Sequence, residues 1–265
     1  ARHGLSERPQ LLDAGQRLPV HLHPTRAFAA RHLDCPFGKT EAWVVVDTPA
    51  GGGLVHVGTT RPVAADEWAD LVAAQDSDTM LGLLHELTVH PGDGVLVPAG
   101  TPHAIGADVF VVELQEPTDF SILLEWGGFD LDGARDGHLG LGFDVALGAV
   151  RPDALSVADV DALVRRRLAA GDDGAILPPA ANPYFRAWRF DRSPNVELPA
   201  AFSVVVALDG AGTLSTTSGE QPLARGDVVV VGHGAGPLII DGAVRGVVAQ
   251  PPDPAAPDPI EWDSP

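Results

Sequence analysis

The sequence predicts an all-β protein with two β-rich lobes and only a few short helices. Short runs of β-branched and apolar residues recur along the chain, at 42–46, 95–97, 202–208 and 228–231, and such runs are typical of buried strands. The chain also contains 30 Gly and 24 Pro, which favours many turns and few long helices. Its 265 residues, 45% of them hydrophobic, are enough for two modest cores.

Taken in order, the elements divide the chain into three parts. We expect a first lobe at 1–148, with short amphipathic helices at 64–72 and 80–86 between its strands. A connector at 149–182 follows, where Ser156 and Asp159 form a capping box that opens a helix through Leu168. Glycine and proline at 171–179 indicate a linker. The second lobe occupies 183–265, and its Pro- and Asp-rich tail from 251 should be poorly ordered.

The segment at 91–103 carries the most information about chemistry. Pro91 and Gly92 open a turn, residues 95–97 form an apolar strand, and a second turn at Pro98 and Gly100 leads to His103. The pattern of Gly92, Pro98, Gly100 and His103 resembles the second motif of the cupins, small β-barrels that usually bind one metal ion.

Further candidate ligands stand upstream of His103. His21 and His23 are two residues apart, so on a strand both imidazoles point to the same face. Glu41 stands at the entrance of the strand at 42–46. Three histidines and a carboxylate make a mixed nitrogen and oxygen site suited to Zn²⁺ or another divalent first-row ion such as Mn²⁺ or Co²⁺.

The surrounding blocks narrow the resemblance to one family. Residues 11–14, 18–24, 38–43, 103–106 and 113–115 resemble, in order and approximate spacing, the short bacterial class I mannose-6-phosphate isomerases. The likeness covers nearly the whole chain, and its motifs are specific in the first half and only suggestive in the second. It implies a tandem cupin of two jelly-roll β-barrels, and a metal held by His21, His23, Glu41 and His103.

The same resemblance implies a function. Family members interconvert an aldose and a ketose by proton transfer through a cis-enediol, which here means mannose and fructose or their phosphates. Lys39 and Glu113 match family positions beside the metal, and we expect them to serve as the acid–base groups. An almost equally favoured interpretation of Lys39 is a solvated surface charge. The alternative for Glu113 is a carboxylate paired with a neighbouring cation or turned back to the metal site.

Three departures from the family pattern concern the substrate phosphate. Gln10 stands where a lysine is common, Pro19 replaces a phosphate-binding serine, and the alignment puts Leu123 at an arginine position. Each lost charge-assisted donor could cost a phosphate about 1.5–3 kcal/mol, unless Arg17 or Arg135 substitutes. The sequence therefore favours an isomerase that can act on an unphosphorylated sugar.

The second lobe repeats the first motif only faintly. Residues 223–228 parallel residues 89–94, but Gly232 replaces the motif proline and Pro237 stands where the histidine would be. We therefore expect no second metal, and we interpret His233 as a loop residue. In the first lobe, His56 should face outward from a strand, and Trp43 should pack in the core rather than line a sugar pocket.

Charge limits the possible partners. The formal net charge of −19 argues against nucleic acid and anionic membranes, since both would repel the chain, and no apolar run is long enough to span a bilayer. Cys35 is the single cysteine, which excludes an internal disulfide. With no signal-like pattern at the N-terminus, we expect a cytoplasmic protein that binds a small sugar or sugar phosphate, in an oligomeric state that the sequence does not predict.

Two other classes of function remain open. Three histidine ligands are also compatible with a different metal cupin, such as an Fe(II) or Ni(II) dioxygenase, which oxygen uptake and metal identity would reveal. A non-catalytic sugar-binding protein is the other alternative, since Gln10, Pro19 and Leu123 replace polar or charged groups; sugar binding without turnover would favour it.

Overall fold

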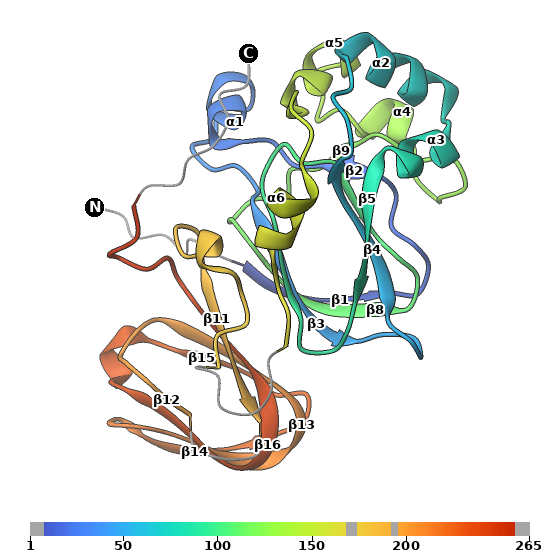
Figure 1. Cartoon of the computed structure of the whole chain (residues 1–265). Helices are drawn as coiled ribbons and strands as arrows, with labels where there is room; N and C mark the ends of the chain where they lie inside the picture. Colours follow the sequence, from blue (N-terminus) through green and yellow to red (C-terminus); the bar gives the residue numbers. More distant parts are fainter. Residues whose placement is uncertain (1–7, 168–173, 192–195, 258–265) are drawn as a thin grey trace.

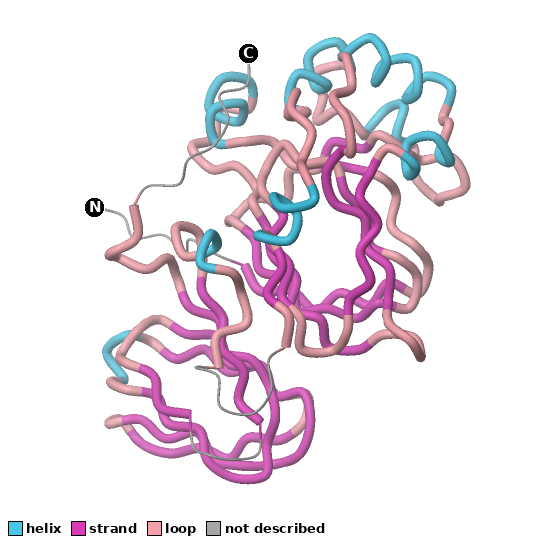
Figure 2. Tube along the Cα trace, viewed as in Figure 1, coloured by secondary structure: helices cyan, strands magenta, loops and turns pink. Residues whose placement is uncertain are grey.

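The structure, a computed structural model, describes residues 8–167, 174–191 and 196–257. It is mostly β, as predicted, and its strands form two barrels (Figure 1, Figure 2). Helices α2–α5 gather over one end of the first barrel, at the upper right of Figure 1, and the second barrel lies at the lower left. None of the described helices has the length and apolar run that a membrane span requires.

The first barrel consists of two five-stranded antiparallel sheets. One sheet has the order β1-β8-β3-β6-β10 and the other β5-β4-β7-β2-β9. Every second side chain along these strands points inward. The inward side chains of both sheets fill the space between the sheets, among them Trp43, Val57, Val97 and Ile105. The strands are β1 (Arg8–Ala14), β2 (His21–Leu22), β3 (Glu41–Asp47), β4 (Gly53–Thr59), β5 (Leu84–Val89), β6 (Gly94–Val97), β7 (His103–Ile105), β8 (Val109–Gln115), β9 (Ile122–Leu123) and β10 (Val164–Arg165).

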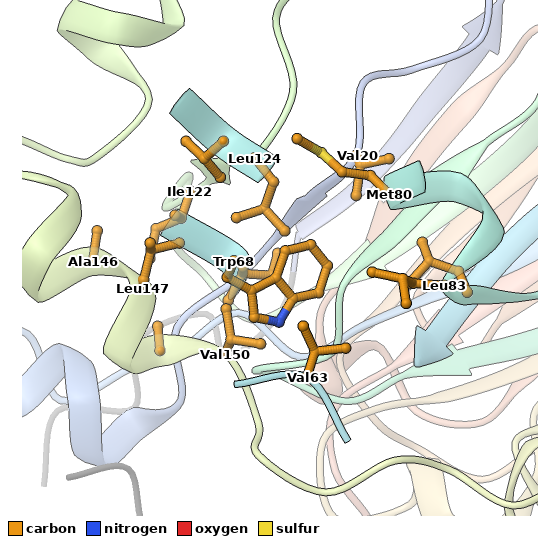
Figure 3. Close-up of a cluster of buried hydrophobic side chains, with 14 of the residues drawn as sticks. Val20, Val63, Trp68, Met80, Leu83, Ile122, Leu124, Ala146, Leu147 and Val150 are labelled. Carbon is orange, nitrogen blue, oxygen red and sulfur yellow. The ribbon is translucent and has the colours of Figure 1, made fainter. Parts of the chain in front are cut away.

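A helical layer covers the sheet that carries β2. Trp68 of α2 lies at the centre of an apolar cluster with Val20, Ile122 and Leu124 from the sheet side and Leu147 from the far side (Figure 3). This cluster holds the short strands β2 and β9 against the rest of the barrel, because burying such side chains is the main source of stability. The helices are α1 (Arg26–His32), α2 (Ala65–Ala74), α3 (Ser77–Gly82), α4 (Gly133–Asp136), α5 (Phe143–Ala146), η1 (Leu147–Ala149) and α6 (Val157–Ala162).

The second barrel is a single antiparallel sheet folded on itself. Its path is β11-β16-β13-β14, with β12 added to β16 and β15 added to β13. The long strands β13 and β16 bend so that each takes part in both halves, and Val205, Leu214, Ile240 and Val248 pack inside. The elements are η2 (Pro179–Ala181), β11 (Arg186–Asp191), β12 (Val196–Leu198), β13 (Ser203–Thr216), β14 (Gly219–Ala224), β15 (Val228–Val231), η3 (His233–Ala235) and β16 (Leu238–Gln250).

The two barrels contain the same turn, as the faint sequence repeat suggested. In the first, Gly92 has φ +97° and the Asp93 carboxylate accepts the His90 N–H at 3.1 Å. In the second, Gly226 has φ +93° and the Asp227 carboxylate accepts the Ala224 N–H at 2.8 Å. Glycine suits both turns because positive φ is strained for other residues.

The barrels meet through an apolar contact. Leu96, Val112 and Leu114 on the first barrel belong to one buried cluster with Val247 and Ala249 of β16. Residues that we assigned to the connector, including Ile176 and Ala181, complete this cluster. The boundaries at 148 and 182 remain a prediction.

Two helix predictions were too long. Residues 84–86 belong to strand β5, paired with β4, rather than to a helix at 80–86. The Ser156–Asp159 capping box is present, but α6 ends at Ala162, because Val164 and Arg165 pair with β6. In both places pairing with a neighbouring strand overrides local helix propensity; Leu168 lies outside the described residues, as do 171–173 of the expected linker.

Two expectations about exposure can be compared with the structure. His56 faces away from the barrel core, as expected, because Val55 and Val57 on either side of it point inward, but its side chain is only 12% exposed. The first part of the tail, 251–257, is held by contacts: Asp253 N–H donates to Asn182 O at 2.9 Å, and Arg186 Nε–H donates to Pro251 O at 3.1 Å. Residues 258–265 of the tail lie outside the described part.

Candidate metal centre and active site

Three imidazoles converge inside the first barrel. His21 and His103 are paired residues on the adjacent strands β2 and β7, and His23 follows β2 directly. The ring centroids of His21 and His103 lie 4.2 Å apart, and that of His23 lies 5.1 Å and 4.9 Å from the other two. One nitrogen from each ring lies within 4.8 Å of the other two.

Backbone carbonyls orient all three rings in the same way. The Nδ1 atoms of His21, His23 and His103 lie 2.8, 2.7 and 2.8 Å from the carbonyl oxygens of Pro19, Phe120 and Thr101. A carbonyl oxygen can only accept, so Nδ1 carries the proton and Nε2 keeps its lone pair. This arrangement of outer partners is typical of metal-binding histidines.

Glu41 completes the cluster from the start of β3. Its Oε2 lies 2.7 Å from His23 Nε2, and its Oε1 lies 3.3 Å from His103 Nε2. The side chain is buried, and Trp43 Nε1–H donates to Oε1 at 2.9 Å. Trp43 is itself fully buried in the barrel core, as expected.

The protonation states of this cluster favour a cation. Burial, together with the neighbouring imidazoles, holds the pKa of His21 well below its usual range. Burial likewise lowers the pKa of His23 to about 4, although Glu41 opposes the shift. Burial opposes ionisation of Glu41, yet His23 and Lys39 hold its pKa well below normal. At neutral pH, the neutral rings of His21 and His23 therefore lie beside the Glu41 carboxylate.

These states leave lone pairs facing one another. His23 Nε2 and Glu41 Oε2 are both acceptors at 2.7 Å, and the buried His103 Nε2 has no hydrogen-bond partner among the described residues. An ion between them removes the repulsion, and a four-coordinate zinc spaces its ligand atoms about 3.3 Å apart. The chemistry of the donor set therefore fits one divalent ion such as Zn²⁺.

Lys39, the only lysine in the sequence, lies beside this cluster. Its Nζ is 3.2 Å from His23 Nε2, 3.3 Å from Glu41 Oε2 and 3.8 Å from Glu113 Oε1. The residue is 8% exposed, so the surface-charge interpretation of Lys39 is wrong. Its position follows from the segment before β3, where Lys39 N–H donates to Pro24 O at 3.1 Å.

Glu113 reaches the same place from β8, opposite Trp43 in the sheet register. Burial raises its pKa to about 9, and the nearby Glu41 carboxylate adds to the shift. A carboxyl group that keeps its proton at neutral pH lies here next to an ammonium group. The alternative interpretation, a carboxylate paired with a neighbouring cation, therefore has the right neighbour but the wrong protonation state.

The cavity at this cluster has about 270 Å³ of space. It is lined by Gln10, Leu12, Leu18, His21, Lys39, Glu41, Ile105, Glu113, Gln115, Asp119 and Ser121. Asp119 and Ser121 were not foreseen as site residues; the only signal was that they follow the Glu113–Gln115 block in the chain. Gln10 lies opposite Glu113 on β1.

Neither arginine considered as a substitute phosphate ligand lines this cavity. Arg17 binds Glu125 through two hydrogen bonds of 2.7 and 2.6 Å. Arg135 is exposed and pairs with Asp136 at 2.6 Å. Leu123 lies next to His21 in the sheet and offers no charge. Among the described lining residues, Lys39 is therefore the only lysine or arginine.

Comparison with known proteins agrees with this site. No protein-family model matches the chain. The mannose-6-phosphate isomerase ManA of Bacillus subtilis is 25% identical over 248 residues, which cover 91% of this chain and 73% of the relative; other curated relatives are matched over 66% of their length.

Solved structures show the same fold. The mannose 6-phosphate isomerase of Bacillus subtilis has a TM-score of 0.71 at 22% identity, covering 93% of this chain and 75% of its own. A zinc-bound mannose 6-phosphate isomerase has a TM-score of 0.68 at 15% identity, covering 95% and 80%.

Fold and site together define a tandem cupin with one candidate metal centre in its first barrel, formed by His21, His23 and His103. At about 25% identity to curated mannose-6-phosphate isomerases over most of its length, the chain is similar to these proteins and divergent from them.

Proposed function

We propose that the protein is a metal-dependent aldose–ketose isomerase that interconverts mannose and fructose or their phosphates. The observation that carries the proposal is the cavity that His21 of the three-histidine cluster shares with Glu41, Lys39 and Glu113. The name of the curated relatives supports the same reaction type.

The reaction moves one proton between C1 and C2 of an open-chain sugar through a cis-enediol. A divalent ion held by His21, His23, Glu41 and His103 supplies Lewis-acid stabilisation for the sugar oxygens. Lys39 and Glu113 can hold and move protons, and their 3.8 Å separation lets both approach one bound sugar. Trp43 keeps the Glu41 carboxylate in place.

The charges in the cavity support a neutral sugar as substrate. Glu41 and Asp119 line it, and Lys39 is the only lysine or arginine among the described lining residues. Lys39 lies 3.3 Å from the Glu41 carboxylate, so little positive charge is left for a dianion. Placing a phosphate without compensating cations costs several kcal/mol. We therefore propose that the enzyme accepts unphosphorylated aldoses.

One experiment tests the proposal directly. Protein loaded with zinc, manganese or cobalt is assayed with paired free and phosphorylated aldoses, mannose and mannose 6-phosphate first. We expect isomerisation, and we expect Lys39→Met and Glu113→Gln to lower kcat at least a hundredfold, a typical effect of removing an acid–base group. The matched control is Glu86→Gln, because Glu86 is a well-exposed carboxylate that does not line the cavity.

Two outcomes would contradict this assignment. Equal turnover in Glu113→Gln and Glu86→Gln would remove Glu113 from the chemistry. Sugar binding without turnover, or oxygen consumption with an iron- or nickel-loaded protein, would favour the sugar-binding or dioxygenase alternative.

The single lysine allows an independent test of the site. An amine-directed reagent can modify only Lys39 and the terminal amino group. We expect zinc and sugar together to slow modification of the Lys39 peptide, as followed by mass spectrometry. An unchanged rate would mean that the sugar binds elsewhere.

A further inference from the structure

A second cavity lies where the two barrels meet, away from the metal cluster. Its walls come from Val44 and Val46 of β3, Ile176 before β11, and Phe190 and Val247 of the second barrel. The cavity has about 90 Å³ of space, well below the usual range for drug-sized ligands, so only a small ligand fits. None of the residues proposed for isomerisation lines it.

Three arginines from separate segments line this cavity: Arg167, Arg189 and Arg245. Arg189 and Arg245 share one face of the β11–β16 pair, because their register partners are Val247 and Asp191. The chain has far more acidic than basic residues, 36 against 17. The three guanidinium groups therefore make this cavity locally positive in a chain whose net charge is negative.

Arg167 is held in place from its backbone. Its N–H donates to the Asp93 carboxylate at 2.9 Å. Its side chain lies over Gly92, where an added Cβ would be 2.6 Å from Arg167 Cδ. The turn at Gly92 thus leaves room for the Arg167 side chain beside the cavity, because glycine has no Cβ.

The ion pairs of Arg167 and Arg245 are weak enough to be replaced. Arg167 lies 3.2 Å from Asp191, and Arg245 lies 3.7 Å from Asp209, with side chains that are between 33% and 50% exposed. Pairs of this kind add little to stability because water screens them. Guanidinium groups form stronger paired hydrogen bonds with phosphates and other oxyanions.

We propose that the cavity between the barrels binds a small organic anion. The oxyanion head lies among Arg167, Arg189 and Arg245, and an apolar body lies against the wall formed by Val44 and Val247. Since such a ligand contacts both barrels, its binding stabilises their arrangement. This site is independent of the proposed isomerase reaction.

Three probes separate the two parts of the proposed ligand. Phenyl phosphate carries both the head and an apolar body, inorganic phosphate carries only the head, and phenol only the body. Titration calorimetry on the metal-loaded protein measures each affinity. We expect phenyl phosphate to bind most tightly and to raise the melting temperature.

Variants assign the binding to this cavity. In the double variant Arg189→Ala, Arg245→Ala we expect phenyl phosphate affinity to fall at least tenfold, and Arg167→Ala should weaken it as well. The matched control is Arg61→Ala, since Arg61 pairs with Glu67 on the surface and lines neither cavity. Metal content is measured for each protein. If all variants hold the same amount of metal, any phenyl phosphate bound at the metal is the same in all of them.

Three results would overturn the proposal. Phenyl phosphate could bind the double variant and the Arg61→Ala protein equally, which would place it elsewhere. The second result is that none of the three probes binds at millimolar concentration. Inorganic phosphate could bind as tightly as phenyl phosphate, which would deny any role to the apolar wall.

Discussion

Replacing Arg17 tests the ion pair that supports the metal-binding strand. Arg17 Nη1 and Nη2 donate to the two oxygens of Glu125 at 2.7 and 2.6 Å, and Glu125 Oε2 also accepts the Val20 N–H at 2.8 Å. Val20 directly precedes His21. The Glu125 side chain is 1% exposed and that of Arg17 27%, so the change Arg17→Met leaves a buried carboxylate without this cation.

The expected cost follows from this burial. Breaking a buried pair by removing one partner costs about 3–5 kcal/mol, and the partial exposure of Arg17 reduces the figure to about 2–3 kcal/mol, since water screens the pair in part. The chain offers a matched control: Arg61 and Glu67 form the same two-bonded pair, but their side chains are 51% and 36% exposed. Arg61→Met should cost clearly less than Arg17→Met, because water screens an exposed pair.

The assay is urea unfolding at neutral pH, with a chelator present so that metal binding does not contribute. Burial opposes ionisation of Glu125, but the bonds from Arg17 and from Val20 N–H lower its pKa. A lowered pKa stabilises the fold above the unfolded value, about 4.3, and this contribution is lost as the pH falls through the folded value. The difference between wild type and Arg17→Met should therefore shrink below about pH 4. Equal costs for the Arg17 and Arg61 variants, or a difference that does not vary with pH, would refute the reasoning.

Three further predictions concern the metal and the substrate. Metal analysis of wild-type protein should give one equivalent of zinc, and His103→Ala should lose it; a full equivalent in the variant, or a second one surviving the change, would contradict the single site. Trp43→Phe removes the hydrogen bond to Glu41 and should weaken zinc binding about 10–100-fold in a chelator competition, with circular dichroism unchanged; wild-type affinity would mean that Trp43 only packs. Wild-type kcat/KM should favour mannose 6-phosphate over mannose by less than a thousandfold, about 4 kcal/mol, and Gln10→Lys should shift that ratio toward the phosphate; a larger wild-type preference would show that a cation outside the cavity residues described here binds phosphate.

The local sequence patterns that predict the metal site can be recognised without a structure. His21 and His23 share a face because strand side chains alternate, and the turn at 91–94 needs glycine wherever it occurs. The signals for β strands were also local, so the all-β class and the strands at 42–46, 95–97 and 228–231 could be predicted. The repeated turn of the second barrel was visible for the same reason.

Long-range contacts decided the rest. The segments at 84–86 and 164–165 became strands because partners far along the chain pair with them. No sequence pattern indicates that Arg17 binds Glu125, 108 positions away, or that Arg167, Arg189 and Arg245 line one cavity. The cation-binding character of the metal cluster also depends on packing. Burial keeps the His21 and His23 imidazoles neutral, and only the folded barrel brings the lone pair of His23 to 2.7 Å from Glu41.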